Sequence, residues 1–187
     1  IKETFMQNFD DGIREDTTLE ALAGLNPVFA AGGSVTAGNS SQMTDGAAAS
    51  VIMSEDKVKA LGVQPIAKFR GYTTVGCKPD EMGIGPALAI PKLMKITGMD
   101  LKDIGLFEIN EAFAAQALYC VNQLKIDQQI VNIHGGAIAL GHPLGCTGAK
   151  LCATLLSNMQ QRGVKYGVES MCVGGGMGVA ALFELCD

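Results

Sequence analysis

Two glycine-rich runs lie in the C-terminal half of this chain: Gly135-Gly136-Ala137-Ile138-Ala139-Leu140-Gly141-His142-Pro143 and Cys172-Val173-Gly174-Gly175-Gly176-Met177-Gly178. Glycine has no Cβ, so it lets the backbone turn sharply and lets a ligand come close to a main-chain N–H. Each run sets one side chain capable of proton transfer among glycines. Both runs are therefore typical of active-site loops, and the pair suggests acid/base chemistry.

The regions around these runs alternate between strand-like and helix-like patterns. Strands are predicted over residues 66–75, 106–109, 166–173 and 178–185, and the last two flank the second glycine run. Helices are predicted over residues 85–96 and 144–161, and from the apolar positions Phe113, Ala117, Val121 and Leu124, which recur at helical spacing. This alternation predicts an α/β fold, with helices on both faces of a sheet.

The N-terminal part has a different character. Residues 1–42 are rich in Asp, Thr, Gly and Asn and show little periodicity, which predicts an extended loop region. The small and β-branched run over residues 46–53 predicts a buried strand. A short helix is expected from Ser54 to Gly62, since these residues are typical of a helix start and stop.

Composition narrows the class of protein. The chain has 187 residues, is 48% hydrophobic and 18% charged, and can bury one substantial core. A net charge of −5 gives no basic footprint for nucleic acid. The 6 cysteines are scattered, so we expect a reducing intracellular setting and no structural disulfides. No apolar run approaches the ~20 residues needed to span a membrane.

Two further motifs complete the pattern: Glu108-Ile109-Asn110-Glu111-Ala112-Phe113-Ala114 and Thr36-Ala37-Gly38-Asn39-Ser40-Ser41. In their order and spacing, the four segments resemble the C-terminal half of the thiolases, enzymes that make or cleave 3-ketoacyl-CoA. The resemblance implies a layered αβαβα architecture with a mixed sheet flanked by helices. It also implies a division of the chain: residues 1–42 as a remnant of the loop domain, 43–65 as the last strand and helix of the N-terminal domain, and 66–187 as the C-terminal domain.

The resemblance implies catalytic roles for four residues. His142 would take the proton of a nucleophilic cysteine and contribute to an oxyanion hole. Cys172 would move the α-proton of acetyl-CoA. Asn110 would hold a water in an oxyanion hole, and the backbone N–H of Gly174 would face the thioester oxyanion.

Two more residues are implied in binding. Ser41 and Ala112 would face the pantetheine arm of CoA. His134 has no role that the resemblance carries over, and we expect it to be a pocket-wall or structural residue.

Each catalytic candidate also has a structural alternative. His142 could be a turn histidine, and Cys172 could be a small buried hydrophobe. Asn110 precedes a predicted helix, so it could be an N-cap that satisfies backbone donors. The wider resemblance favours the catalytic interpretation in all three cases.

Other chemistries fit the sequence poorly. Residues 141–150 look like a phosphate loop, but Ala149 stands where a glycine is required, and no Ser or Thr follows Lys150. Residues 174–178 lack the dinucleotide-binding glycine spacing and lead into a strand. No C-x-x-C pair supports a metal site, so we expect none.

The resemblance implies a nucleophilic cysteine in the N-terminal half of the enzyme, and no segment of this chain corresponds to the part of that half that carries it. The chain begins at Ile1, so we expect a fragment or one piece of a nicked enzyme, inactive alone. The expected partners are that N-terminal half, acyl-CoA and CoA as substrates, and a further copy in a homo-oligomer. We expect no cofactor, nucleic acid or membrane span, and an intracellular location: cytoplasmic if bacterial, peroxisomal as the alternative.

The implied activity is that of an acetyl-CoA C-acyltransferase, which cleaves 3-ketoacyl-CoA with CoA through an acyl-cysteine intermediate, as in fatty acid β-oxidation. Residues 38–42 and 166–172 look more like broad-chain thiolases than acetoacetyl-CoA-specific ones. The alternatives are a biosynthetic acetoacetyl-CoA thiolase and a non-catalytic thiolase-like half that binds CoA. A related condensing enzyme is disfavoured, because such enzymes place a histidine or asparagine where this chain has Cys172.

Overall fold

The computed structural model describes residues 4, 6, 8–10 and 12–186. Residues 1–3, 5, 7 and 11 of the expected loop region, together with Asp187, lie outside the described residues. The strands are β1 (Ala67–Gly76), β2 (Leu106–Ile109), β3 (Tyr166–Val173) and β4 (Met177–Leu185). The α-helices are α1 (Leu19–Ala23), α2 (Glu55–Leu61), α3 (Gly85–Thr97), α4 (Ala114–Leu124), α5 (Ala137–Leu140) and α6 (Thr147–Arg162). Short 3-10 turns are η1 (Ala37–Asn39), η2 (Pro79–Ile84), η3 (Leu101–Asp103) and η4 (Gln128–Ile130).

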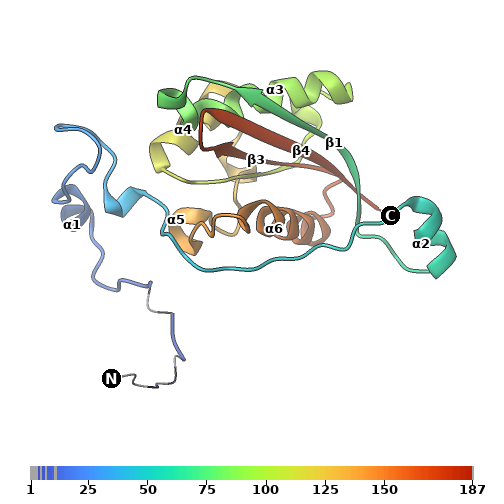
Figure 1. Cartoon of the computed structure of the whole chain (residues 1–187), viewed down its shortest axis with the longest axis horizontal. Helices are drawn as coiled ribbons and strands as arrows, with labels where there is room; N and C mark the ends of the chain where they lie inside the picture. Colours follow the sequence, from blue (N-terminus) through green and yellow to red (C-terminus); the bar gives the residue numbers. More distant parts are fainter. Residues whose placement is uncertain (1–3, 5, 7, 11, 187) are drawn as a thin grey trace.

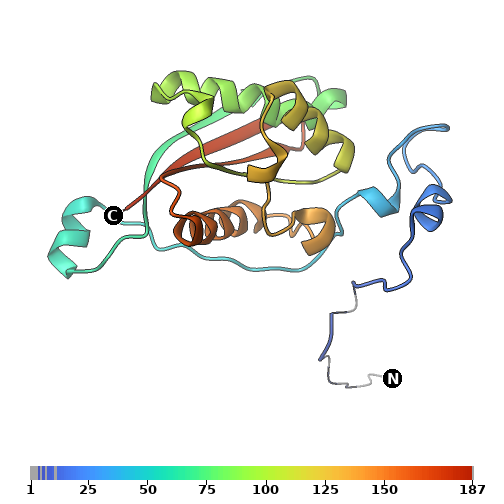
Figure 2. The same cartoon turned by 180° about the vertical axis from the view of Figure 1, so that it is seen from behind.

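The four strands form one mixed sheet in the order β1-β4-β3-β2. β4 pairs antiparallel with both β1 and β3, whereas β2 pairs parallel with β3. α3 and α4 cover one face of this sheet, and α6 covers the other (Figures 1 and 2). The predicted α/β sheet with helices on both faces is confirmed.

The core follows from the alternation of side chains along the strands. On β4, Ala180 and Leu182 point toward α3, while Ala181 and Phe183 point toward α6, because successive strand residues face opposite sides. The α3 side is the larger cluster; its most buried large side chains are Phe107, Ile90, Leu93, Ile109 and Leu182. Each face of the sheet therefore anchors its own helix layer.

Most predicted helix ends are confirmed by their caps. The Ser54 side chain accepts from the Lys57 N–H to start α2, and Gly62 ends it with a φ of 63°. Gly98 ends α3 with a φ of 69°. α6 begins at Thr147 instead of Leu144, because residues 143–146 form a turn in which the Cys146 N–H donates to the Pro143 carbonyl at 2.9 Å.

The buried strand predicted over residues 46–53 is wrong. These residues form no strand, and the side chains of Val51 and Ile52 are 88% and 87% exposed. The segment instead runs extended along the α6 side of the molecule (Figures 1 and 2). A strand needs a hydrogen-bonding neighbour, and no strand of the described residues lies beside this segment.

Two glutamates lie side by side inside the sheet. Glu108 on β2 is the register partner of Glu169 on β3, and its side chain accepts a hydrogen bond from Asn158 Nδ2 at 3.0 Å. Glu169 Oε2 is buried with no partner among the described residues. Burial raises the pKa of Glu108 to about 7 and that of Glu169 to about 8, and the neighbouring Glu108 charge adds to the second increase.

These two carboxyls should make the protein less stable as pH rises. Their folded-state pKa values lie above the ordinary 4.5, so the folded chain keeps protons that the unfolded chain has already released. Their stabilising contribution is complete below about pH 4.5 and is lost as pH rises through about 8. Glu169→Gln should therefore raise the free energy of unfolding at pH 8.5 by several kcal/mol, since each pKa unit corresponds to about 1.4 kcal/mol, and have little effect at pH 4.5.

Urea unfolding of both proteins across this pH range gives the measurement. The exposed carboxyl variant Glu81→Gln is the matched control. Equal pH slopes for Glu169→Gln and the parent chain would contradict the assigned cause.

Candidate functional site

Asn110 and Cys172 lie at the ends of two neighbouring parallel strands. Asn110 directly follows β2, and its backbone N–H donates to the Ser170 carbonyl of β3 at 2.9 Å. Cys172 lies further along β3, next to its last residue. Because the carboxyl ends of parallel strands meet at one edge of a sheet, the fold brings these two predicted site residues to the same edge.

The Asn110 side chain is buried and has no protein partner. It is 1% exposed, and neither of its side-chain polar atoms bonds to a described residue. The N-cap of α4 is Phe113, which makes no side-chain cap bond, so the N-cap alternative for Asn110 is wrong. A buried amide without a partner costs about 1–3 kcal/mol, which makes Asn110 a group suited to hold a water or a substrate oxygen.

Cys172 carries a half-buried thiol opposite Gly178 of β4. All six cysteines are free thiols. Burial raises the pKa of Cys172, and the nearby Cys120 and Cys77 add to the increase. At neutral pH the side chain is therefore a thiol, which is the form that can donate a proton.

The turn between β3 and β4 requires glycine. Gly175 and Gly176 have φ values of 92° and 91°, and the Gly176 carbonyl accepts from the Cys77 N–H at 2.8 Å. No atom of the described residues lies within 4 Å of the place where a Cβ on Gly174 would stand. A ligand can therefore approach the backbone of Gly174 closely.

Two contacts of the Thr147 hydroxyl favour one tautomer of the His142 ring. Its Nδ1 lies 2.6 Å from Thr147 Oγ1, and that hydroxyl donates its proton to the Pro143 carbonyl at 3.0 Å. A hydroxyl has only one proton to give, so Thr147 Oγ1 accepts from Nδ1–H. In the tautomer that satisfies both contacts, the proton lies on Nδ1, and Nε2 keeps the lone pair with which it can act as a base.

The segment after η1 joins the predicted binding residues to the histidine loop. The Ser41 N–H donates to the Ala112 carbonyl at 3.0 Å, and the neighbouring Gln42 carbonyl accepts from the His142 N–H at 2.9 Å. The structure thus brings Ser41, Ala112 and His142 into one connected region. Their roles toward CoA stay predictions.

His134 lies apart from this region. It is exposed and lines an open pocket of about 430 Å³ on the α6 side, whose other lining residues are Ala153, Thr154, Ser157, Asn158 and Gln161. This position agrees with the expected pocket-wall residue.

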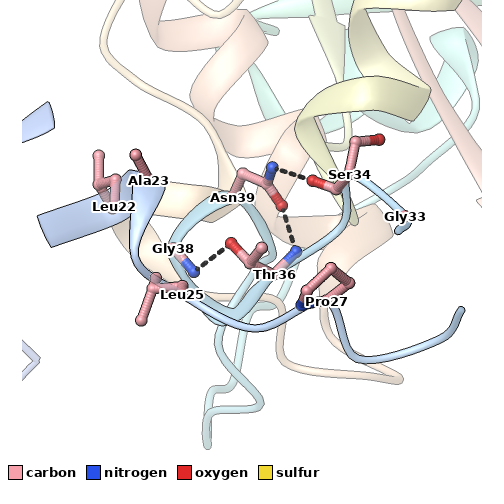
Figure 3. Close-up of a pocket in the computed structure, with 9 residues that line it drawn as sticks. All are labelled: Leu22, Ala23, Leu25, Pro27, Gly33, Ser34, Thr36, Gly38 and Asn39. Atoms are coloured by element: carbon pink, nitrogen blue, oxygen red, sulfur yellow. Dashed lines mark hydrogen bonds between the residues drawn. The ribbon is translucent and has the colours of Figure 1, made fainter. Parts of the chain in front are cut away.

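A second pocket of about 470 Å³ lies between α1 and the η1 segment (Figure 3). Its polar groups bond to one another: Asn39 Nδ2 donates to the Ser34 carbonyl at 2.8 Å, and Thr36 N–H donates to Asn39 Oδ1 at 2.9 Å. Gly38 N–H donates to Thr36 Oγ1 at 3.2 Å. None of the predicted catalytic residues lines this pocket, and its hydrogen bonds hold the loop in shape.

Four polar residues around the site were missed by the sequence analysis: Thr147, Lys150, Glu111 and Asn132. Thr147 fixes the His142 ring, and Lys150 Nζ donates to the Gly141 carbonyl at 3.4 Å. Glu111 carried a signal, since it follows Asn110 directly in a quoted motif. Thr147, Lys150 and Asn132 carry no signal in the sequence, because each acts only through contacts made in the fold.

The described part of the chain holds neither a metal-ligand cluster nor a membrane-spanning helix. There, no group of three or more His, Cys, Asp and Glu side chains is placed to hold a metal ion. Each helix in that part is too short or too polar to cross a lipid bilayer.

The electrostatics of His142 give a testable expectation. Burial lowers the pKa of His142, and the Lys150 ammonium lowers it further, because a nearby positive charge disfavours the imidazolium. Lys150→Met should therefore raise the pKa of His142. An NMR titration of the imidazole protons measures it, and a His134→Gln background leaves one histidine signal to follow.

Lys57→Met serves as the control, since it removes an equal charge from the exposed helix α2. An unchanged or lower His142 pKa in Lys150→Met would contradict the assigned influence of Lys150.

Comparison with curated proteins gives closely similar relatives. The chain is 52% identical over 186 residues to the 3-ketoacyl-CoA thiolase of Bacillus subtilis, covering 100% of this chain and 48% of that protein. It is 54% identical over 184 residues to the peroxisomal 3-ketoacyl-CoA thiolase B of Rattus norvegicus, covering 98% of this chain and 43% of that protein. The chain thus spans about half the length of these relatives.

Several solved structures are also closely similar to this chain. The acetyl-CoA acetyltransferase of Bacillus anthracis matches with a TM-score of 0.90 and 45% identity, over 100% of this chain and 48% of that one. Human mitochondrial 3-ketoacyl-CoA thiolase in complex with CoA matches with a TM-score of 0.86 and 42% identity, over 97% and 46%. The dimeric peroxisomal thiolase of Saccharomyces cerevisiae matches with a TM-score of 0.82 and 46% identity, over 95% and 44%.

Family models describe both parts of the chain. Residues 63–185 match the model described as "Thiolase, C-terminal domain", and residues 1–56 match "Thiolase, N-terminal domain". The finer division at residues 42 and 65 stays a prediction. Because these two models together cover most of the chain, this chain belongs to the thiolase family.

Proposed function

We propose that this chain supplies the acid/base groups of a 3-ketoacyl-CoA thiolase, which cleaves 3-ketoacyl-CoA with CoA into acetyl-CoA and a shortened acyl-CoA. The observation that carries the proposal is the chain of contacts from His142 Nδ1 through Thr147 Oγ1 to the Pro143 carbonyl. Thr147 holds the proton on Nδ1, so Nε2 is a ready acceptor for the proton of a thiol. The nucleophilic cysteine itself would come from an N-terminal thiolase half.

In the proposed reaction, two thiols and one imidazole of the enzyme exchange the protons, and each group ends the cycle in its starting state. The nucleophile gives its proton to His142 Nε2 and attacks the C3 carbonyl of the substrate. The C2–C3 bond then breaks, and its electron pair takes the proton of the Cys172 thiol to give acetyl-CoA. The Cys172 thiolate next deprotonates CoA, which attacks the acyl-cysteine, and His142 returns its proton to the nucleophile.

The protonation state of Cys172 fits the proton transfer that the proposed cleavage needs. Burial raises the pKa of this thiol, so it begins the cycle as a proton donor, as cleavage of 3-ketoacyl-CoA requires. Asn110 and the backbone of Gly174 would stabilise the oxyanions, and Ser41 and Ala112 would face the pantetheine arm. Catalysis by these groups uses acyl-CoA and CoA as substrates and no further cofactor.

The solved relatives support the proposed partners. One human relative is described in complex with CoA, and the yeast relative is described as dimeric, so we expect this chain to bind CoA and to assemble as a homo-oligomer. We expect the cellular location of the enzyme to depend on the organism: the cytoplasm in a bacterium and the peroxisome in a eukaryote. The Bacillus anthracis relative makes a biosynthetic acetoacetyl-CoA thiolase the second candidate. Turnover of short against long 3-ketoacyl-CoA separates the two.

The test is a chimera in which this chain follows the N-terminal half of the Bacillus subtilis relative. Cys172→Ala should retain some acylation of the nucleophile by an acyl-CoA, because CoA can leave as a thiolate, but lose cleavage of 3-ketoacyl-CoA by about 100-fold or more, because the enolate has no proton donor. His142→Ala should lose acylation itself. Mass spectrometry of the acyl-enzyme and a thiolysis assay measure the two steps.

The intact Bacillus subtilis enzyme is the positive control, and circular dichroism compares the folding of all variants. Normal thiolysis by Cys172→Ala, or normal acylation of His142→Ala, would refute the assigned roles.

The tautomer argument predicts a separate result for Thr147. Thr147→Val removes the oxygen that accepts from Nδ1–H, so the ring can adopt the other tautomer, and acylation should slow about 10-fold or more. Thr147→Ser keeps the hydroxyl and should restore most of the rate. Acylation by Thr147→Val at the parent rate would show that this hydrogen bond does not set the tautomer.

A further inference from the structure

Glu111 and Asn132 form a compact hydrogen-bonded unit between two of the site's loops. Asn132 Nδ2 donates to Glu111 Oε1 at 2.9 Å, and the Ile138 N–H donates to Glu111 Oε2 at 3.3 Å. One carboxylate therefore bonds to Asn132, which follows η4, and to the first turn of α5. Glu111 itself directly follows Asn110 in the chain.

Asn132 ties the unit to the sheet. Its side chain accepts from the Ile109 N–H at 2.8 Å and donates to the Ile109 carbonyl at 2.8 Å. Its own backbone N–H donates to the Phe107 carbonyl at 2.9 Å. The residue has a φ of 47°, a left-handed conformation that asparagine tolerates better than most residues. Asn132 thus continues the pairing of β2 where that strand ends.

Both ends of α5 make contacts that fix its position. Gly136 precedes the helix with its backbone against Glu111, and a Cβ at this position would overlap the Glu111 carboxylate. At the far end, the Gly141 carbonyl accepts from Lys150 Nζ at 3.4 Å, immediately before His142. The four-residue helix α5 is therefore a short rigid spacer from Glu111 to His142.

From these contacts we propose that Glu111, together with Asn132, is a positioning residue that sets the place of His142 relative to Asn110. Neither residue touches the reacting atoms. Both act by joining the loop of Asn110 to the loop of His142 in one unit. The inference rests on the proposed thiolase function for its effect on catalysis, but the unit itself does not depend on that function.

Exchanging the two side-chain types tests the hydrogen-bonded unit of Glu111 and Asn132. Glu111→Gln places an amide donor against the donors of Asn132 and Ile138, and Asn132→Asp sets two carboxylates face to face. The double variant Glu111→Gln with Asn132→Asp lets the Gln amide donate to the Asp carboxylate and its oxygen accept from Ile138, whereas the donor to the Ile109 carbonyl is lost in both variants that carry Asn132→Asp. Asp also tolerates the left-handed conformation.

In the chimera, each single variant should lower kcat by about 10-fold or more and leave KM within about twofold, because small misplacements of catalytic groups are costly. The double variant should recover part of kcat. Glu81→Gln, which removes an exposed carboxylate from η2, should change neither value. Single variants with parent kcat, or a double variant no better than Asn132→Asp alone, would overturn the proposal.

Hydrogen exchange of the parent chain tests the unit without any variant or assay. The Ile109 amide bonds to Asn132 and the Ile138 amide bonds to Glu111, so both should open with the same free energy. Rapid exchange of the Ile138 amide beside a protected Ile109 amide would show that Glu111 and Asn132 do not open as one unit, and would overturn the proposal. An inactive parent chimera with equal protection at both amides would reject the thiolase function alone.

Discussion

The parallel pairing of β2 with β3 is the constraint on which the site depends. β2 has four residues, and further backbone bonds extend its pairing at both ends: Gly105 N–H to the Tyr166 carbonyl at 3.0 Å, and Asn110 N–H to the Ser170 carbonyl at 2.9 Å. Phe107 and Ile109 point into the α3 cluster. A slip of one residue would turn both toward α6 and bring Glu108 to the α3 side, so burial fixes the register. Fixing the register also fixes Asn110 beside the end of β3.

Helix α6 connects the opposite face of the sheet to the same edge. Gly167 lets it approach β3 closely, because a Cβ there would meet the side chains of Met159 and Leu155. The N-terminal turn of α6 carries Thr147 and Lys150 to the histidine loop, and Asn158 further along bonds to Glu108. Helix α6 therefore orients the ring of His142. Through the hydrogen bond from Asn158, it also offsets part of the free-energy cost of burying the Glu108 carboxyl.

The sequence was informative where local chemistry decides structure. Ser54, Gly62 and Gly98 predicted helix ends correctly, and the segments with strand-like composition predicted all four strands of the sheet. The run over residues 46–53 failed because an apolar pattern shows that a segment suits a strand but does not say which strand lies beside it.

The same limit applies to the site. Glycine-flanked residues such as His142 and Cys172 stand out in the sequence, since close backbone turns need glycine. The residues that orient them do not stand out, because Thr147 and Asn132 are ordinary polar residues until the fold brings them to a partner. The N-cap alternative for Asn110 failed for a related reason: the helix begins after Phe113, and no periodicity marks that start.

The buried polar groups without partners divide into two physical kinds. The carboxyl of Glu169 can relieve its burial by taking up a proton, and its raised pKa of about 8 describes that response. The amides of Asn110 and Gln116 cannot ionise or lose charge, so their unpaired atoms keep the full cost of desolvation. A fold tolerates that cost only where packing around it is strong, and Asn110 directly follows Ile109, which is fully buried in the larger core cluster. For Glu169 burial therefore leads to protonation, whereas for Asn110 it leaves a rigid, unsatisfied hydrogen-bonding group at the edge where the substrate would react.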